Sequence, residues 1–349
     1  MSGQKHGPVA AAIRCGLSLA SVPYRIGVRT RNRRFDRDAD AVQHCGVPVV
    51  SVGNLTTGGT GKTPVVAYLA RWFRDREVRV AIVSRGYGRG DADHNDEAAE
   101  LHQRLPDVPH LQDPDRVRSA QIAVEELESQ LILMDDGFQH RRLHRDLDIV
   151  LIDMTCPFGY GHLLPRGLLR EPVDGLRRAG AVILTRCDQV DAQAVRTVTA
   201  TVREHLPSSA PIVASTHQPS QLLTHPDTTG PIDALRRRRV AAVCGIGNPS
   251  AFHQTLLDCG AQLVATRSLP DHAEYDRETV QDLDRWVREL DGIDEVICTQ
   301  KDLVKLQTDR LGGKPLRALV IEADIENTPE FQRSLEAVLA MVLDSSGDV

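Results

Sequence analysis

One glycine-rich segment constrains the fold of this chain more than any other feature. Residues 53–64 are Gly-Asn-Leu-Thr-Thr-Gly-Gly-Thr-Gly-Lys-Thr-Pro, and they follow the apolar run Val47–Val52 and open the helical stretch Lys62–Arg76. A strand, a glycine turn and a helix in this order are the setting that a nucleotide phosphate loop requires. The segment therefore predicts a unit that binds a nucleotide; the alternative is a glycine-rich turn without a ligand.

Each residue type in this loop has a chemical role. Glycines allow backbone N–H groups to converge on phosphate oxygens, and the helix adds the positive end of its dipole. Lys62 is expected to neutralise the charge of the β- and γ-phosphates, and the Thr63 hydroxyl to bind Mg²⁺. In the pattern G-x-x-x-x-G-K-[ST], Thr56 stands at the position of the first glycine. The predicted nucleotide-binding residues of the loop are Thr56, Thr57, Gly58, Gly59, Thr60, Gly61, Lys62 and Thr63.

Short apolar runs alternate with helical stretches over most of the chain. This alternation predicts an α/β fold of the P-loop NTPase-like class, with a parallel sheet covered by helices on both faces and a smaller second α/β lobe. Strands are expected at residues 47–52, 78–83, 131–134, 149–152 and 181–184, and again at 240–244, 262–266, 295–298 and 318–321. Helices are expected at 62–76, 115–128, 192–205, 249–258, 277–290 and 330–343.

The sequence predicts four parts along the chain. Residues 207–239 are rich in Pro, Ser, Thr and His and have little periodicity, which is typical of an irregular linker. We expect a nucleotide-binding and catalytic lobe at 46–206, the linker at 207–239, and a second lobe at 240–349 that closes the active site. Residues 1–45 precede them as an amphipathic helix and a basic segment.

Two adjacent carboxylates, Asp135 and Asp136, follow the apolar run Leu131–Met134. Ligands of open parallel sheets bind at this carboxyl edge, and a carboxylate there can hold the Mg²⁺ of a nucleotide. Because successive strand residues point in opposite directions, we expect one aspartate at the metal and the other to position the acceptor. A solvated turn is the alternative, since Asp153 ends the run 149–152 in the same way.

Arginines follow another predicted strand and recur in a loop. Arg85 and Arg89 come after the second strand, and the segment 164–171 holds two arginines and a glutamate. Guanidinium groups there are suited to gripping a phosphate or a carboxylate, although each can equally form a surface ion pair. The predicted substrate-binding residues are Asn54, Arg85, Arg89, His140, Arg166, Arg170 and Glu171.

Two polar strings lie in the expected second lobe. Asp271-His272 is either a general base with its partner or a capping pair before the next helix. Lys301-Asp302 follows a strand and resembles the base-reading end of a nucleotide site, with the carboxylate on an exocyclic group of the base. We therefore add Lys301 and Asp302 to the predicted nucleotide-binding residues.

The first 35 residues are basic, although the whole chain is acidic. The net charge is −6, from 42 basic and 48 acidic residues, yet residues 1–35 hold seven basic residues and no acidic one. Val9, Ile13 and Leu17 recur there at helical spacing. An amphipathic helix with adjacent arginines is typical of a segment that lies on an anionic membrane surface, and an ordinary surface helix is the alternative. No apolar run reaches the ~18–20 residues needed to span a bilayer.

The composition argues against several other classes of protein. A negative net charge and only 4% aromatic residues argue against a nucleic-acid partner. The seven cysteines are scattered and form no Cys-x-x-Cys pair, which indicates a reducing compartment rather than disulfides or structural zinc.

Taken together, these strings resemble one known family. Their combination is similar to the pattern of tetraacyldisaccharide 4'-kinase, the lipid A 4'-kinase of Gram-negative envelope synthesis. The matching strings run in the family's order over nearly the whole chain, at residues 49–64, 84–89, 135–140, 164–171, 244–249, 271–272 and 299–302. Thr56 at the first glycine position is itself part of the family's pattern.

The resemblance implies an activity and a place of action. The family transfers the γ-phosphoryl group of ATP to the 4'-hydroxyl of a tetraacylated glucosamine disaccharide 1-phosphate, and the product is lipid IVA. ATP and Mg²⁺ are the implied cofactors. Residues 1–35 are then expected to dock the enzyme as a peripheral protein on the cytoplasmic face of the inner membrane. We expect neither a nucleic-acid partner nor an obligate protein partner.

The resemblance also implies catalytic residues. A carboxylate–histidine pair is thought to activate the sugar hydroxyl in the family, and His272 stands at the matching histidine. The carboxylate usually lies in a Gly-Asp-Glu-Pro string, and the matching Asn95-Asp-Glu-Ala98 makes Asp96 the candidate, although both flanking residues differ. With the phosphate loop and the strand-end acids, the expected catalytic residues are Asp96, His272, Asp136 and Lys62.

Two other classes of function remain open from the residues alone. One is a GTP-dependent switch or metallocentre chaperone of the P-loop type, in which residues 299–302 would read guanine. The other is a membrane-recruited binding protein that uses nucleotide only to dock. Competition between ATP and GTP for binding distinguishes the first class from a kinase. Phosphate that appears on a lipid acceptor distinguishes a kinase from both classes.

Overall fold

The computed structural model describes residues 7–86, 96–271 and 273–346, with the side chains of residues 39, 96, 97 and 346 left out. The chain forms two compact units. The first unit consists of Met1–Tyr87, Pro106–Thr216 and Asp324–Val349, and the second of Gly88–Leu105 and His217–Ala323.

The first unit is built on a parallel sheet. Its strands lie in the order β7-β6-β5-β1-β4-β2-β3, and each neighbouring pair is parallel. β1, β2, β4 and β6 are buried along their whole length, so the sheet is covered on both faces, as parallel sheets generally are. The strands are β1 (Val49–Asn54), β2 (Val80–Ser84), β3 (His110–Gln112), β4 (Leu131–Asp135), β5 (Leu147–Asp153), β6 (Ala181–Thr185) and the first part of β7 (Ile212–Thr224), whose residues 217–224 belong to the second unit.

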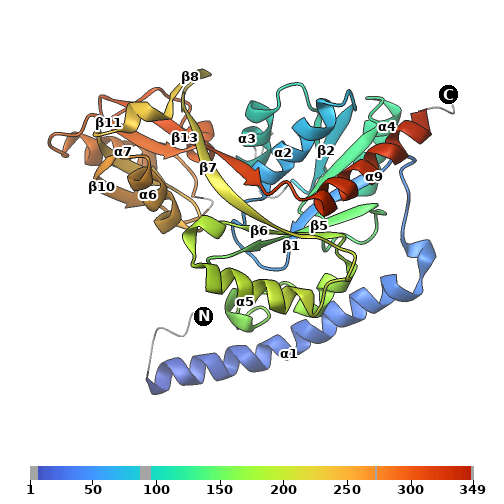
Figure 1. Ribbon diagram of the computed structural model, residues 1–349. Helices are drawn as coiled ribbons and strands as arrows, with labels where there is room; N and C mark the ends of the chain where they lie inside the picture. The colour runs from blue at the N-terminus through green and yellow to red at the C-terminus, as the bar shows by residue number, and fades with distance from the viewer. Residues whose placement is uncertain (1–6, 87–95, 272, 347–349) are drawn as a thin grey trace. The chain divides into compact units, whose positions relative to one another are not determined.

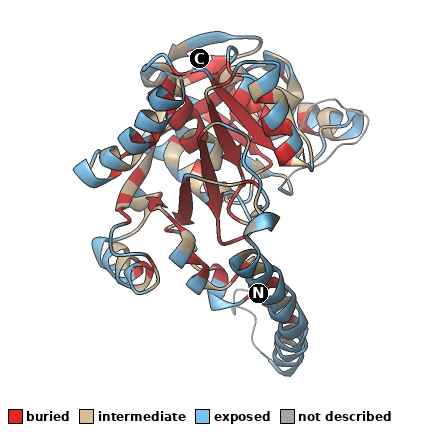
Figure 2. Ribbon diagram, turned by 90° about the vertical axis from the view of Figure 1, so that its right-hand side faces the viewer, coloured by how far each residue is buried: buried red, intermediate tan, exposed pale blue. Residues whose placement is uncertain are grey.

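Helices cover both faces of this sheet, as the sequence predicted. Figure 1 shows α5 on one side of the strands and α2 and α9 on the other, and Figure 2 shows the buried strands between them. Side chains fix the starts of two helices, because Asp115 accepts the amides of Val117 and Arg118, and Asp191 accepts that of Ala194. The α-helices are α1 (Pro8–Arg37), α2 (Lys62–Arg74), α4 (Arg116–Glu125), α5 (Ala192–Arg203) and α9 (Pro329–Ser346), and the short 3-10 helices are η1 (Ala39–Ala41), η2 (Gly159–Gly161), η3 (Val173–Arg178) and η4 (Cys187–Gln189).

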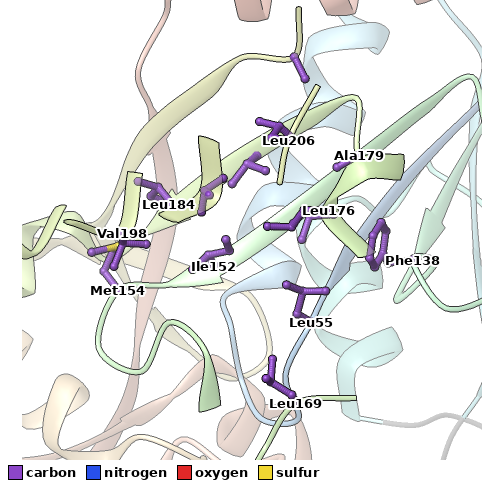
Figure 3. Close-up of a cluster of buried hydrophobic side chains, with 14 of the residues drawn as sticks. Leu55, Phe138, Ile152, Met154, Leu169, Leu176, Ala179, Leu184, Val198 and Leu206 are labelled. Atoms are coloured by element: carbon purple, nitrogen blue, oxygen red, sulfur yellow. The ribbon is translucent and has the colours of Figure 1, made fainter. Parts of the chain in front are cut away.

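One apolar cluster anchors the loops at the carboxyl edge of the sheet. Leu55 follows β1, Phe138 follows β4, and Leu169 comes from the loop after η2; all three are buried and pack in one cluster (Figure 3). The same cluster includes Ile152 of β5 and Val198 of α5. Loops with polar tips are therefore fixed at their bases by burial of apolar side chains.

Helix α1 packs on the first unit along one side only. Ser21 and Val28 are buried, whereas Leu19, Val22 and Ile26 are more than half exposed. Because residues of a helix turn by about 100° each, Leu19 and Ile26 lie on the side opposite the buried two, and Val22 lies at the edge of that side. No helix among the residues that the structure describes combines the length and the apolar character needed to cross a bilayer.

The second unit holds a mixed sheet. β9 lies between β10 and β11, β11 pairs with β13, and these pairs are parallel, whereas β8 and β12 form antiparallel pairs with β7 and β13. The strands are β8 (Thr228–Pro231), β9 (Arg239–Cys244), β10 (Gln262–Ser268), β11 (Glu295–Thr299), β12 (Arg310–Leu311) and β13 (Lys314–Ile325). The helices are α3 (Asp96–Arg104), α6 (Pro249–Asp258), α7 (Arg277–Arg288), α8 (Gln300–Leu306) and the 3-10 helix η5 (Ile232–Leu235).

Three expectations about the organisation differ from the structure. Residues 96–105, expected in the nucleotide-binding lobe, belong to the second unit, where α3 lies. The prediction that 207–239 is irregular is wrong, because β7, β8 and η5 lie there. β7 is mostly half-buried and mixes Ser, Thr and Gln with apolar residues, so it forms no apolar run of the kind that identifies the other strands. Residues 324–349, expected in the second lobe, belong to the first unit, where Phe331 and Leu335 of α9 are fully buried.

Candidate active site

The glycine turn after β1 is open on its outer side. Gly58 and Gly59 are exposed, and a Cβ atom at either would meet no heavy atom within 4 Å. Gly58 has φ 109° and Gly61, the N-cap of α2, has φ 83°, so both adopt conformations that favour glycine. At the base of the turn, a Cβ atom on Gly53 would lie 2.6 Å from the backbone nitrogen of Phe138.

Protein donors hold the carbonyl groups of this loop. Arg170 N donates to Leu55 O at 2.7 Å, and Asn54 Nδ2 donates to Thr56 O at 2.8 Å. Further along, Arg186 Nη2 donates to Gly59 O at 2.9 Å and the Thr185 hydroxyl to Thr60 O at 3.0 Å. Because the carbonyls are bound on the protein side, an anion at the open side of the turn is not repelled by them.

A carboxylate at the neighbouring strand end lies between two cations. Asp136 follows β4, the neighbour of β1, and its Oδ1 is 3.7 Å from Lys62 Nζ at the start of α2. Arg170 binds both oxygens of the same carboxylate, Nη1 to Oδ1 at 2.7 Å and Nη2 to Oδ2 at 2.8 Å. Burial by itself raises the pKa of Asp136, but hydrogen bonds from Arg170 and the charge of Lys62 outweigh it and hold the pKa far below its ordinary value.

The other strand-end acids have different surroundings. Asp135 is buried, and its Oδ1 accepts the amide of Asp136 at 2.9 Å. Asp153 at the end of β5 forms an ion pair with Arg186 and accepts the Thr155 amide, as expected for a structural strand end. Asp135 and Asp136 thus lie beside the phosphate loop in two distinct environments.

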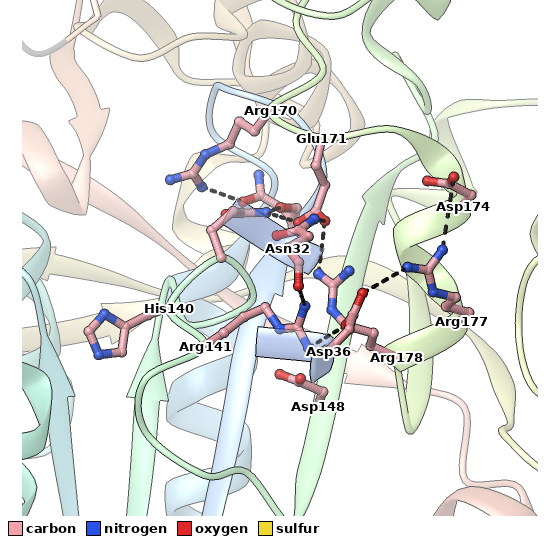
Figure 4. Close-up of polar contacts among 12 residues, drawn as sticks. Asn32, Asp36, His140, Arg141, Asp148, Arg170, Glu171, Asp174, Arg177 and Arg178 are labelled. Atoms are coloured by element: carbon pink, nitrogen blue, oxygen red, sulfur yellow. Dashed lines mark hydrogen bonds and ion pairs between the residues drawn. The ribbon is translucent and has the colours of Figure 1, made fainter. Parts of the chain in front are cut away.

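Glu171 is fully buried in a polar network. Its carboxylate accepts hydrogen bonds from Gln139 Nε2 and Arg178 Nη2, both at 2.8 Å, and from Asn32 Nδ2 at 3.3 Å. Figure 4 shows Asn32 and Arg178 converging on it. Gln139 also donates to Asn54 O at 2.9 Å. The sequence predicted that Glu171 contacts a substrate. Its burial and its hydrogen bonds instead suit a residue that positions its neighbours.

Four further polar residues of the first unit lie in segments that follow the carboxyl ends of its strands. His140 Nε2 is buried and has no hydrogen-bond partner among the described residues. Burial, followed by the charges of Arg116 and other arginines, lowers the pKa of His140 to about 4, so the ring is neutral at pH 7. Arg116 is buried at the start of α4, and no sequence motif singled it out. Arg85 is exposed after β2, and Arg166 is half-buried.

In the second unit, Lys301 and Asp302 lie in the first turn of α8. Lys301 Nζ lies 3.5 Å from Asp271 Oδ1. Asp302 is fully buried, and its oxygens accept hydrogen bonds from Thr299 Oγ1 at 2.6 Å, Tyr275 Oη at 2.8 Å and Gly245 N at 3.1 Å. Burial raises the pKa of Asp302 despite these bonds. Because these three donors occupy its oxygens, Asp302 links the segments of Gly245, Tyr275 and Thr299. This arrangement suits a structural role better than contact with a base.

Some of the predicted residues lie outside what the structure describes. These are Arg89, His272 and the side chain of Asp96, although Asp96 itself is the first residue of α3.

The parallel sheet, the open glycine turn and the lysine that heads α2 beside a strand-end carboxylate together define a nucleotide-binding protein of the P-loop class. The profile of the family described as Tetraacyldisaccharide-1-P 4'-kinase matches residues 13–340. The chain therefore belongs to the tetraacyldisaccharide 4'-kinase family and is a kinase.

Individual relatives agree with this assignment. A tetraacyldisaccharide 4'-kinase of Anaeromyxobacter dehalogenans strain 2CP-C is 39% identical over 358 residues, which cover 97% of this chain and 93% of that protein. One from Geobacter sulfurreducens is 36% identical and covers 97% of each chain. Among solved structures, LpxK of Aquifex aeolicus in complex with ATP has a TM-score of 0.74 and 31% identity, over 93% of this chain and 99% of that one.

Proposed function

We propose that this kinase transfers the γ-phosphoryl group of ATP to the 4'-hydroxyl of a tetraacylated glucosamine disaccharide 1-phosphate, at the carboxyl edge of the sheet of the first unit. One observation carries this placement. The open turn Gly58–Gly61 leads directly into Lys62, whose ammonium group lies 3.7 Å from Asp136 at the adjacent strand end. A cation and an exposed glycine turn next to carboxylates are the parts that phosphoryl transfer uses.

The oxygen donors beside the loop suit Mg²⁺. The Thr63 hydroxyl lies in the first turn of α2, and the carboxylates of Asp135 and Asp136 end the neighbouring strand. Hard oxygen ligands of this kind are those that Mg²⁺ prefers, so these three residues would hold it together with the phosphates. When bound, the ion would neutralise charge on the phosphates during transfer. Lys62 adds a second positive charge there, and Arg170 keeps Asp136 ionised and oriented.

The reaction needs a group that takes the proton of the attacking hydroxyl. The oxygen of the 4'-hydroxyl forms a bond to the γ-phosphorus, the bond to the β-phosphate oxygen breaks, and ADP leaves. We assign the proton to His272, paired with Asp96, because the family's catalytic histidine and carboxylate match these positions. A histidine with a carboxylate partner can accept a proton near neutral pH.

The lipid substrate calls for a membrane contact, which we assign to α1. Its outward side carries Leu19, Val22 and Ile26, all more than half exposed, and arginines follow in the last turns of the helix. Apolar side chains can enter the headgroup boundary while guanidinium groups bind lipid phosphates. The chain would then act as a peripheral protein on the cytoplasmic face of the inner membrane.

A labelling experiment tests the proposed function. The purified chain is incubated with γ-labelled ATP, Mg²⁺ and detergent-dispersed tetraacyldisaccharide 1-phosphate, with and without excess unlabelled GTP. We expect label in the lipid, little competition by GTP, and no transfer without Mg²⁺. Label released only as free phosphate, with GTP as the stronger competitor, would favour a nucleotide switch. Nucleotide binding without any label transfer would favour a docking protein.

A further inference from the structure

The loop at residues 163–171 contacts α1 on one side and the phosphate loop on the other. We infer that this loop couples α1 to the site of phosphoryl transfer, and that Tyr24 and Asn32 of α1 are positioning residues for the reaction. The inference rests on the proposed function. It gives α1 a role in the site that is separate from membrane attachment.

Three residues on the inward side of α1 form hydrogen bonds with the 163–171 loop. The Ser21 hydroxyl lies 3.2 Å from Leu163 O, and the Tyr24 hydroxyl donates to Arg170 O at 2.9 Å. Two turns further along, Asn32 Nδ2 donates to Glu171 Oε2 at 3.3 Å. The three residues share one side of the helix, so α1 contacts the loop at its first residue and at its last two.

The other side of the same loop holds the phosphate loop. Thr57 N donates to Leu168 O at 2.8 Å, and Arg170 N donates to Leu55 O at 2.7 Å. Thr56 and Leu169 form a β-bridge between these two bonds. The first half of the phosphate loop is thus paired, residue by residue, with the segment that α1 binds.

Arg170 joins the two sets of contacts within one residue. Its carbonyl is bound by Tyr24 of α1, its amide by Leu55, and its guanidinium group by both oxygens of Asp136. A shift of its backbone therefore moves the guanidinium group that orients Asp136 beside Lys62. Phosphoryl transfer is sensitive to displacements of this size, because its rate depends on positioning.

Further polar contacts hold Asn32, whose side-chain amide binds Glu171. Arg141 Nη1 donates to Asn32 O at 2.9 Å, and its guanidinium group pairs with Asp36 at 2.8 Å, so Asn32 is fixed at its backbone and its amide (Figure 4). Glu171, which accepts the Asn32 amide, is fully buried. A hydrogen bond lost there leaves a buried carboxylate less well satisfied, and its neighbours move to compensate.

Substitutions on the inward side of α1 test the inference in detergent, where no membrane recruitment is needed. Tyr24→Phe, Asn32→Ala and the double variant are compared with Ser18→Ala, which removes an exposed hydroxyl that donates to Arg14 O of the same helix. We measure kcat and KM for ATP, sedimentation with vesicles of phosphatidylethanolamine and phosphatidylglycerol, and melting temperature.

We expect kcat to fall about five-fold in Tyr24→Phe and at least ten-fold in the double variant, as for one and two lost hydrogen bonds. KM for ATP and vesicle binding should change less than two-fold, and Ser18→Ala should match the unchanged chain. A double variant whose kcat stays within two-fold of the unchanged chain overturns the inference. The failure of the proposed function itself appears differently, since the unchanged chain would then label no lipid.

Discussion

Asp136 is the residue at which the phosphate loop, the end of β4 and the 163–171 loop meet. The carboxylate is kept ionised by Arg170 and Lys62 although it is mostly buried. The planar fork of an arginine binds both oxygens at once, which fixes the direction of the carboxylate as well as its charge. This direction matters because the same carboxylate is proposed to hold Mg²⁺.

Arg170→Lys keeps the charge but removes the two-point contact with Asp136. We expect kcat to fall at least ten-fold, because a single ammonium group cannot orient the carboxylate in the same way. The matched control is Arg177→Lys, on an exposed arginine that pairs with Asp36 and Asp174, and it should stay within two-fold. Steady-state kinetics in detergent measure both, and equal rates for Arg170→Lys and the unchanged chain would exclude an orienting role.

His140 makes stability depend on pH. Its folded pKa is about 4, below the ordinary value of 6.5. Between these pH values His140 is protonated in the unfolded chain but not in the folded chain. The free energy of unfolding therefore falls as the pH drops from 6.5 towards 4. His140→Gln should therefore gain stability relative to the unchanged chain between pH 7 and pH 5. Urea unfolding at pH 7 and pH 5 measures the free energy of unfolding of both proteins. If the difference between the variant and the unchanged chain is the same at both pH values, His140 is not buried in its neutral form.

Helix α1 illustrates how one element serves two surroundings. Its inward side binds the body through Ser21, Tyr24 and Asn32, and its outward side exposes Leu19 and Ile26. The apolar spacing of the sequence predicts such a helix. The contacts of its inward side are between residues more than 100 positions apart, so local patterns do not reveal them.

Changes on the outward side of α1 should weaken membrane binding alone. In Leu19→Ser combined with Ile26→Ser, we expect at least ten-fold weaker binding to vesicles that contain phosphatidylglycerol, because two apolar side chains no longer enter the bilayer. Leu127→Ser, on an exposed leucine outside α1, is the control. If the double variant sediments like the unchanged chain, the membrane contact lies elsewhere.

Burial also explains which elements the sequence predicts. β1, β4 and β6 are buried along their whole length and mostly apolar, because both faces of a parallel sheet are covered, and all three were expected. β7 was missed because its exposed and buried positions mix polar with apolar residues. The short helix α3 has few apolar residues and gave no clear period.

At the scale of the whole molecule, the sequence predicts which residues are polar and near strand ends but not which way they face. The phosphate loop was predictable because its glycines, lysine and threonine stand at fixed spacing. Glu171 and Asp302 were predicted as ligand contacts, yet both are fully buried and bound by protein donors. Their partners come from distant parts of each unit, and no spacing rule joins them.

The central claim is that the phosphate loop of the first unit holds the transferred phosphoryl group. The most direct measurement is the rate of lipid phosphorylation by Lys62→Ala, with Arg74→Ala as the control, since Arg74 is a cation of the same helix that pairs with exposed Asp107. We expect a loss of at least a thousand-fold for Lys62→Ala and of less than two-fold for Arg74→Ala. A Lys62→Ala variant that phosphorylates the lipid at near-normal rate would contradict the claim.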